Sequence, residues 1–174
     1  GHEAMDCVER NVEELGIADA GLARTGNLRC AHNALAQKRL AAEAETARGM
    51  FGDTSLSILS AGEVQEETGS AAFGGGVLST HAGVIHPLNY ARGLAAALRA
   101  RGGDIFENSA VSSFRTEGEC TVVTTRDGEV TARHLLIATN GYSDITAATA
   151  AVRGTVIPFR SAMIATEPLD AALR

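Results

Sequence analysis

The residue pattern of this chain changes near Pro87, and that change constrains its fold more than any other feature. Residues 26–79 alternate short β-prone runs with helical ones. From Pro87 to residue 142 the order becomes a helix with an apolar stripe, strand-like runs, a β-hairpin and a long apolar run. The two orders are typical of different layers. The sequence therefore predicts an α/β chain, with α+β character, made of two parts.

Local signals predict where several elements begin and end. Ser60 followed by Glu63 is a capping box, and Pro87 suits the first turn of a helix. Asp127-Gly128 favours the turn of a hairpin. We expect helices over about 5–15, 33–48, 60–68 and 88–101, with a short one after residue 142. Strands are expected over 28–30, 56–59, 71–79, 104–107, 110–114, 120–125, 129–133, 134–142, 154–159 and 161–166.

Three consecutive glycines, Gly74-Gly75-Gly76, interrupt the predicted strand 71–79. Glycine in a strand interior costs conformational entropy and offers no side chain to pack. The triplet therefore indicates a bulge or a close contact with another part of the molecule.

Composition excludes several classes of function. The 174 residues carry a net charge of −6 without a basic patch, which argues against nucleic-acid and anionic-membrane surfaces. The three cysteines, Cys7, Cys30 and Cys120, are odd in number and widely spaced, so neither a disulfide framework nor a zinc site is expected. No apolar run approaches the ~20 residues of a membrane span, and no secretion signal opens the chain. We expect a cytoplasmic protein.

The familiar local motifs of catalysis are absent. There is no G-x-G-x-x-G between a strand and a helix, no P-loop, no G-x-S-x-G and no H-E-x-x-H. Residues alone therefore predict a soluble α/β fold with an unusual glycine-rich strand.

Longer stretches carry a resemblance. The run FGGGVLSTHAGVIHPLNYARGLAAALRARGGDIFENSAVSSF (residues 73–114) resembles the middle of the FAD-dependent oxidoreductases that include D-amino-acid oxidase, glycine oxidase and sarcosine oxidase. LLIATNGYSD (135–144) and IPFRSAMIATEPL (157–169) resemble later strands of the same family, in the same order. ATNGY and the last of these runs are most similar to its gamma-glutamylputrescine oxidoreductase branch.

The resemblance implies a Rossmann-like FAD domain interleaved with an antiparallel-sheet substrate domain. On that map, residues 1–25 and 86–152 form part of the FAD-binding domain. Residues 26–85 and 153–174 form part of the substrate-binding domain. Because the glycine fingerprint is expected before residue 1 and a closing segment after residue 174, the chain resembles an internal fragment.

The resemblance also implies cofactor-binding residues. Val111 falls where the family holds the adenine edge with main-chain groups; the alternative is a core valine. Ala138, Thr139, Asn140 and Gly141 fall where the family's chain passes close to the dinucleotide; the alternative is a tight turn after a buried strand. Small residues in this run permit close backbone approach.

Three further residues are candidates for the substrate side. His81 and His86 flank the point where the family's chain leaves the substrate sheet near the flavin, although a surface or helix-capping role is the alternative for each. Arg160 can meet a substrate carboxylate through two parallel hydrogen bonds, against ordinary surface pairing.

The implied activity is oxidation of the C–N bond of a small amine or amino acid, with FAD as cofactor. Two alternatives stay open. One is a non-catalytic module that binds a small molecule or a protein, and the other is one subunit of a split oxidase, with a complementary chain completing the fold.

We predict that residues 1–174 alone bind FAD only weakly. Much of the affinity in such folds comes from pyrophosphate held at a glycine-rich turn and a helix N-terminus, and these residues supply neither. A few hydrogen bonds of about 1 kcal/mol each do not offset the several kcal/mol lost on association, so the expected Kd is on the order of millimolar. Titration with FAD, followed by flavin fluorescence, measures it; a micromolar Kd contradicts the prediction.

Overall fold

The computed structural model describes residues 2–143, 147–152, 154–157 and 159, and the chain divides into two compact units, Gly1–Ile105 and Phe106–Arg174. The first unit contains α1 (His2–Glu14), β1 (Asn27–Cys30), α2 (Ala34–Phe51), β2 (Leu56–Leu59), α3 (Ala61–Thr68), β3 (Gly76–Ser79) and α4 (Pro87–Ala100). The second contains β4 (Val111–Glu117), β5 (Cys120–Thr125) and β6 (Glu129–Ala132). Short 3₁₀ turns lie at Ala18–Ala20, Asn140–Tyr142 and Ala147–Val152.

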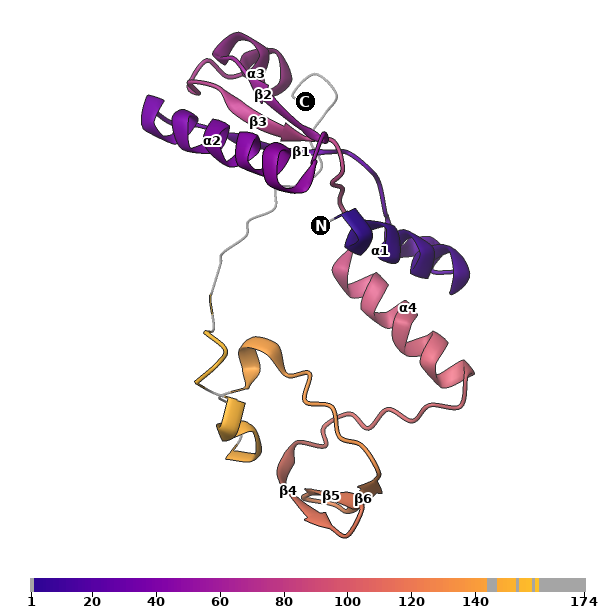
Figure 1. Ribbon diagram of the computed structural model, residues 1–174. Coiled ribbons are helices and arrows are strands. Elements are labelled where there is room, and N and C mark those ends of the chain that lie inside the picture. Colours follow the sequence, from indigo (N-terminus) through magenta and orange to yellow (C-terminus); the bar gives the residue numbers. More distant parts are fainter. Residues whose placement is uncertain (1, 144–146, 153, 158, 160–174) are drawn as a thin grey trace. The chain divides into compact units, whose positions relative to one another are not determined.

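A three-stranded antiparallel sheet organises the first unit, with β3 between β1 and β2. Helix α2 lies along this sheet and contacts β2 and β3, while α3 packs against β2 (Figure 1). Val64 of α3 and Val77 of β3 are the largest fully buried side chains among the described residues. The core is therefore small and is centred on the middle strand.

The glycine triplet marks close packing, as its sequence predicts. Gly75 has a φ of +137°, and a Cβ added there would lie 2.7 Å from the Gln37 side-chain amide of α2. A Cβ on Gly76 would lie 2.8 Å from the carbonyl oxygen of Arg29 and 3.2 Å from a methyl group of Val64. The missing side chains thus let both helices and β1 approach the start of β3.

The predicted helix signals are confirmed. Ser60 and Glu63 form the reciprocal hydrogen bonds of a capping box, and this bonding holds the pKa of Glu63 below its ordinary value. Asn33 caps α2 by accepting a hydrogen bond from the Ala36 N–H, and Pro87 opens α4.

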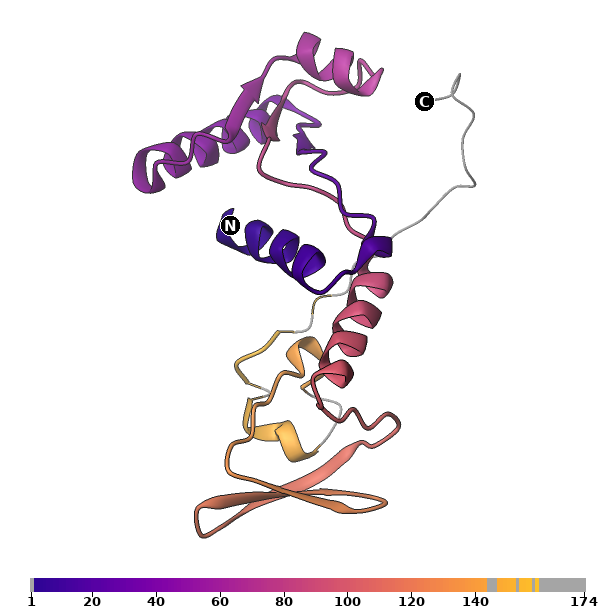
Figure 2. The ribbon, with the colours of Figure 1, turned by 90° about the vertical axis from the view of Figure 1, so that its right-hand side faces the viewer.

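Two connecting segments run side by side between the sheet and the pair of helices α1 and α4 (Figure 2). Ala23 and Val84 exchange backbone hydrogen bonds of 3.0 and 2.9 Å, and the Gly26 N–H donates to the Ala82 carbonyl over 3.0 Å. Asn11 of α1 donates to the Tyr90 hydroxyl of α4 over 3.1 Å. The chain therefore enters and leaves the sheet region through one paired connection.

The second unit contains an antiparallel meander in the order β4-β5-β6, which confirms the predicted hairpin. Arg115 of β4 forms an ion pair with Glu129 of β6 at 2.9 Å. That hydrogen-bonded guanidinium holds the pKa of the Glu129 carboxyl below its ordinary value. The two sheets share no strand among the described residues. The compact units divide between Ile105 and Phe106, whereas the residue pattern changes near Pro87, so the expected FAD-binding and substrate-binding parts stay a prediction.

Two strand predictions in the second half of the chain are wrong. Residues 134–142 were expected as a buried strand, but they form no ladder, and Leu136 is 87% exposed. Residues 104–107 also form no strand, and Phe106 is 70% exposed. An apolar run becomes a strand only where a neighbour pairs with its backbone, and no described strand lies beside either run. Accordingly, the described residues do not form a βαβ unit from α4 and residues 134–142.

Other expectations need narrower bounds. The strand predicted over 71–79 is confined to β3, because Gly74 and Gly75 lie outside the ladder. The short helix after residue 142 is a 3₁₀ turn, and residues 154–157 and 159 form no strand. The strand expected at 161–166 lies outside the described residues.

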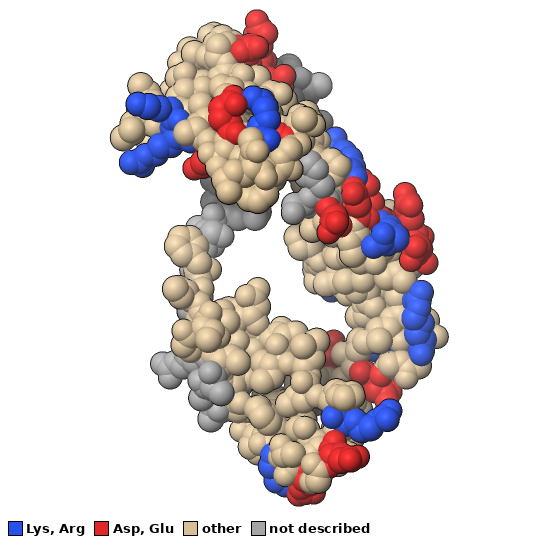
Figure 3. Space-filling model, viewed as in Figure 1, with Lys and Arg blue, Asp and Glu red and all other residues tan. Residues whose placement is uncertain are grey.

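No helix in the described part of the chain is long and apolar enough to cross a membrane. On the face drawn in Figure 3, acidic and basic side chains are intermixed, without a continuous basic surface.

Arg24, beside the paired connection, gathers charged groups from two other segments. Its guanidinium donates to Asp6 of α1 over 2.7 Å and to both carboxylate oxygens of Glu9. The hydrogen bonds from Arg24 hold the pKa values of both carboxyl groups below their ordinary values. This cluster fixes α1 to the connection.

We predict that Gly76→Ala destabilises the fold by about 1–3 kcal/mol, because the added methyl group would overlap a backbone carbonyl that cannot rotate away. Gly49→Ala is the matched control: Gly49 lies within α2 with no atom within 4 Å of an added Cβ, so alanine should stabilise by up to about 1 kcal/mol. Urea unfolding measures both; equal effects in the two variants contradict the packing account.

We predict that Arg24→Gln raises the pKa values of Asp6 and Glu9 toward 3.8 and 4.5. Since both are lowered in the folded chain, their stabilising effect is present above these ordinary values and is lost as pH falls through the lowered ones. The stability difference between wild type and variant should therefore disappear in strong acid. Carboxyl NMR titration and unfolding across pH test this, with Arg10→Gln on α1 as the charge-matched control.

Candidate cofactor-binding site

The meander positions Val111 at the start of an edge strand. Val111 is opposite Thr125, but the register shifts between Val111 and Ser113, so Ser112 is an extra residue on β4. The Ser112 hydroxyl donates to the Thr124 carbonyl over 3.1 Å and holds this bulge. A bulge bends a strand and changes the direction in which its first residues face.

The run that follows β6 returns to Val111 and lines an open cavity of about 320 Å³. Its lining is almost entirely apolar, and Thr139 and Thr149 supply hydroxyl groups. The lining residues are Ala110, Val111, Phe114, Leu135, Leu136, Ile137, Ala138, Thr139, Tyr142, Ala148 and Thr149. The structure thus brings together three of the residues predicted to bind the cofactor: Val111, Ala138 and Thr139.

The other two predicted residues, Asn140 and Gly141, lie in the 3₁₀ turn beside the cavity and not in its lining. Asn140 has a φ of +45°. Its carbonyl oxygen accepts hydrogen bonds from the Ser143 N–H at 3.2 Å and the Ser143 hydroxyl at 2.7 Å. Ser143, which sequence reasoning missed, is only 4% exposed and organises this turn.

The substrate-side candidates lie elsewhere. The His81 ring contacts Asp6 at 3.3 Å and Arg24 at 3.2 Å, within the charged cluster on α1. His86 accepts the Asn89 N–H at 3.2 Å and caps α4, which is the capping role considered as its alternative. Arg160 lies outside the described residues. Binding of substrate by these residues stays a prediction.

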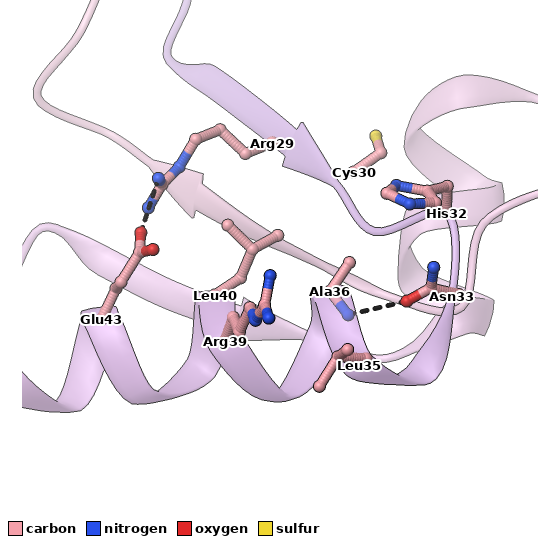
Figure 4. Close-up of a pocket in the computed structure, with 9 residues that line it drawn as sticks. All are labelled: Arg29, Cys30, His32, Asn33, Leu35, Ala36, Arg39, Leu40 and Glu43. Atoms are coloured by element: carbon pink, nitrogen blue, oxygen red, sulfur yellow. Dashed lines mark hydrogen bonds and ion pairs between the residues drawn. The ribbon is translucent and has the colours of Figure 1, made fainter.

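A second cavity, between β1 and α2, was not foreseen from the sequence. It measures about 350 Å³, and Arg29 and Glu43 form an ion pair of 2.9 Å at one end (Figure 4). His32 and Arg39 line it without a hydrogen-bond partner among the described residues. The sequence contains only an indirect signal for this cavity. Arg29, His32 and Arg39 lie near the start of α2, but no motif joins them.

The cavity beside Val111 has the size and lining of a small-molecule pocket. Small-molecule pockets span about 300–1,000 Å³ and combine apolar walls with a few polar groups, so this one is at the small end. Its walls are mostly apolar, and the Thr139 hydroxyl, which lies 2.8 Å from the Ser143 hydroxyl, belongs to the lining. In the described part of the chain no group of His, Cys, Asp and Glu is arranged to hold a metal ion.

Comparison with known sequences identifies the family of this chain. The family described as FAD dependent oxidoreductase matches residues 1–174. A probable oxidoreductase OrdL of Haemophilus influenzae is 32% identical over 71% of this chain and 29% of its own length. Gamma-glutamylputrescine oxidoreductase of Escherichia coli is 38% identical over 53% of this chain and 21% of its own length. The chain thus spans less than a third of the relatives it matches.

Solved structures share the fold. Glycine oxidase from Geobacillus kaustophilus superposes with a TM-score of 0.73 at 24% identity, over 80% of this chain and 39% of that protein. L-Proline dehydrogenase from P. horikoshii gives a TM-score of 0.72 at 18% identity, over 87% and 40%. The predicted fold class is confirmed, and the match along the whole sequence shows that this chain belongs to the FAD-dependent oxidoreductase family.

Proposed function

We propose that the protein carrying this chain oxidises the carbon–nitrogen bond of a small amine or amino acid. The family match over residues 1–174 carries this proposal, and the names of gamma-glutamylputrescine oxidoreductase and glycine oxidase agree with it. FAD, when bound, supplies the hydride acceptor for this oxidation, which leaves an imine that water hydrolyses. The role of this chain's own residues is to bind the cofactor and to orient it.

In this proposal Val111 holds the adenine edge through its main-chain groups, while its side chain forms part of the apolar wall. The position at the start of β4, next to the bulge, supports the role, because a bulge re-aims the backbone at the end of a ladder. Recognition by main-chain groups tolerates any small apolar side chain.

The run from Ala138 to Gly141 then passes beside the dinucleotide. Ala138 and Thr139 already line the cavity with Val111, and the Ser143 hydroxyl fixes the turn that follows them. Short side chains at these positions let the backbone approach a ligand closely. A turn held by hydrogen bonds is preorganised, so less ordering is needed when the ligand binds.

The domain assignment belongs to the same proposal. Residues 1–25 and 86–152 contribute to FAD binding, and residues 26–85 and 153–174 to the substrate side, with His81, His86 and Arg160 as candidates. The described thiols, Cys7, Cys30 and Cys120, are free, which supports a reducing compartment such as the cytoplasm.

We predict that Ala138→Trp lowers FAD affinity by at least about tenfold, or ~1.4 kcal/mol, because the indole would occupy the cavity beside Val111. Flavin absorbance after gel filtration of the protein that carries residues 1–174 measures retained cofactor.

The matched control is Thr131→Trp, which adds the same ring on β6 at an exposed position that does not line the cavity beside Val111. It should keep its flavin. Equal FAD content in the two variants would remove the cavity from the proposed site. A wild-type protein without flavin absorbance, and without amine oxidation when FAD is supplied, would overturn the proposed function itself.

A further inference from the structure

The turn after the cavity contains the single Asn-Gly pair of the sequence, Asn140-Gly141. Asn140 is exposed, and among the described residues its side-chain amide makes no hydrogen bond. The Gly141 N–H is also without a hydrogen-bond partner in the described part of the chain. Neither the side-chain amide of Asn140 nor the following backbone N–H is therefore held by a hydrogen bond within the described residues.

The carbonyl oxygen of Asn140 belongs to the peptide bond that contains the Gly141 nitrogen. It accepts two hydrogen bonds, from the Ser143 hydroxyl at 2.7 Å and the Ser143 N–H at 3.2 Å. When the Gly141 nitrogen loses its proton, the negative charge is shared with this oxygen. Hydrogen-bond donors aimed at an oxygen where charge develops stabilise the charged form. Ser143 therefore favours formation of the nucleophile.

The Ser143 hydroxyl is oriented toward the Asn140 carbonyl by two hydrogen bonds. It lies 2.8 Å from the Thr139 hydroxyl, and since Ser143 donates to the Asn140 carbonyl, Thr139 donates to Ser143. Ser143 is 4% exposed, so little water competes for its hydroxyl. Such a chain of hydrogen bonds polarises its last member and strengthens it.

We propose that Asn140 is a site of spontaneous deamidation, at which Ser143 activates the Gly141 nitrogen through the Asn140 carbonyl. The Gly141 nitrogen gives its proton to water and attacks the side-chain carbon of Asn140, forming a new C–N bond. The bond to the side-chain nitrogen breaks, and ammonia leaves with a proton from solvent. Water then opens the resulting succinimide to aspartate or isoaspartate.

The modification places a carboxylate in the turn that the proposed function sets beside a dinucleotide. Its effect on the cofactor rests on that proposed function: a negative charge at position 140 repels the phosphates of FAD. Deamidation to aspartate would thus lower cofactor retention by charge alone, and conversion to isoaspartate would also lengthen the main chain of the turn.

The test is incubation of the purified protein at neutral pH, followed by peptide mass spectrometry and an isoaspartate assay. In wild type, Asn140 is expected to convert faster than every other asparagine. In Asn140→Gln, residue 140 should not convert, because the longer side chain would have to close a less favourable ring. Ser143→Ala should slow conversion about tenfold, the effect of one hydrogen bond to a charged group. No conversion at Asn140 in wild type overturns the proposal.

A control in unfolded protein distinguishes the effect of the Ser143 hydrogen bond from the intrinsic reactivity of the Asn-Gly pair. In denaturant, Asn140 should convert at the same rate in wild type and in Ser143→Ala, because the hydrogen bond is absent from both. A Ser143→Ala rate in native protein that equals or exceeds the wild-type rate would show that the turn does not activate the reaction. Circular dichroism confirms that the native variant remains folded.

Flavin retention is measured separately. Asn140→Asp should retain less FAD than Asn140→Gln, since only the former adds charge. If conversion occurs but the two variants retain equal flavin, the modification site stands and the position of Asn140 beside the dinucleotide is wrong. If the wild-type protein that carries residues 1–174 neither holds flavin nor oxidises amines when FAD is supplied, the proposed function fails while the deamidation result is unaffected.

Discussion

The close approach of three backbones and two helices at Gly75 and Gly76 determines how the first unit packs. β3 is the middle strand, so whatever occupies its first positions contacts β1, β2, α2 and α3 together. With no side chain there, the amide of Gln37 reaches across to the Leu59 carbonyl over 3.1 Å, and Val64 becomes fully buried. A larger residue would separate the helices from the sheet, and the small core around Val64 and Val77 could not close.

Elements defined by local chemistry could be predicted from the sequence. The Ser60–Glu63 capping box, the opening of α4 at Pro87 and the hairpin around Gly128 each depend on residues within a few positions of one another. The run at 134–142 is different. Its apolar residues favour burial, but strand formation depends on a partner that its own sequence does not specify, and here it forms part of a cavity wall.

The candidate site shows the same limit. Val111 and Ala138 are separated by a three-stranded meander, and nothing in their spacing indicates that they line one cavity; only the resemblance to FAD-dependent oxidoreductases placed both near the dinucleotide. Ser143 carries no motif, and its importance comes from burial and from two hydrogen bonds to one carbonyl. The cavity between β1 and α2 likewise depends on side chains that tertiary packing, not sequence order, brings together.

The paired connection at Ala23 and Val84 has a consequence for how such proteins diversify. Everything between Gly26 and Ala82, a complete three-stranded sheet with its two helices, begins and ends within one backbone hydrogen bond of 3.0 Å. A segment whose ends meet in this way is topologically an insertion. Its length or sequence can therefore change without displacing helices α1 and α4. Evolution can therefore alter the segment between Gly26 and Ala82 while the remainder of the chain keeps its architecture.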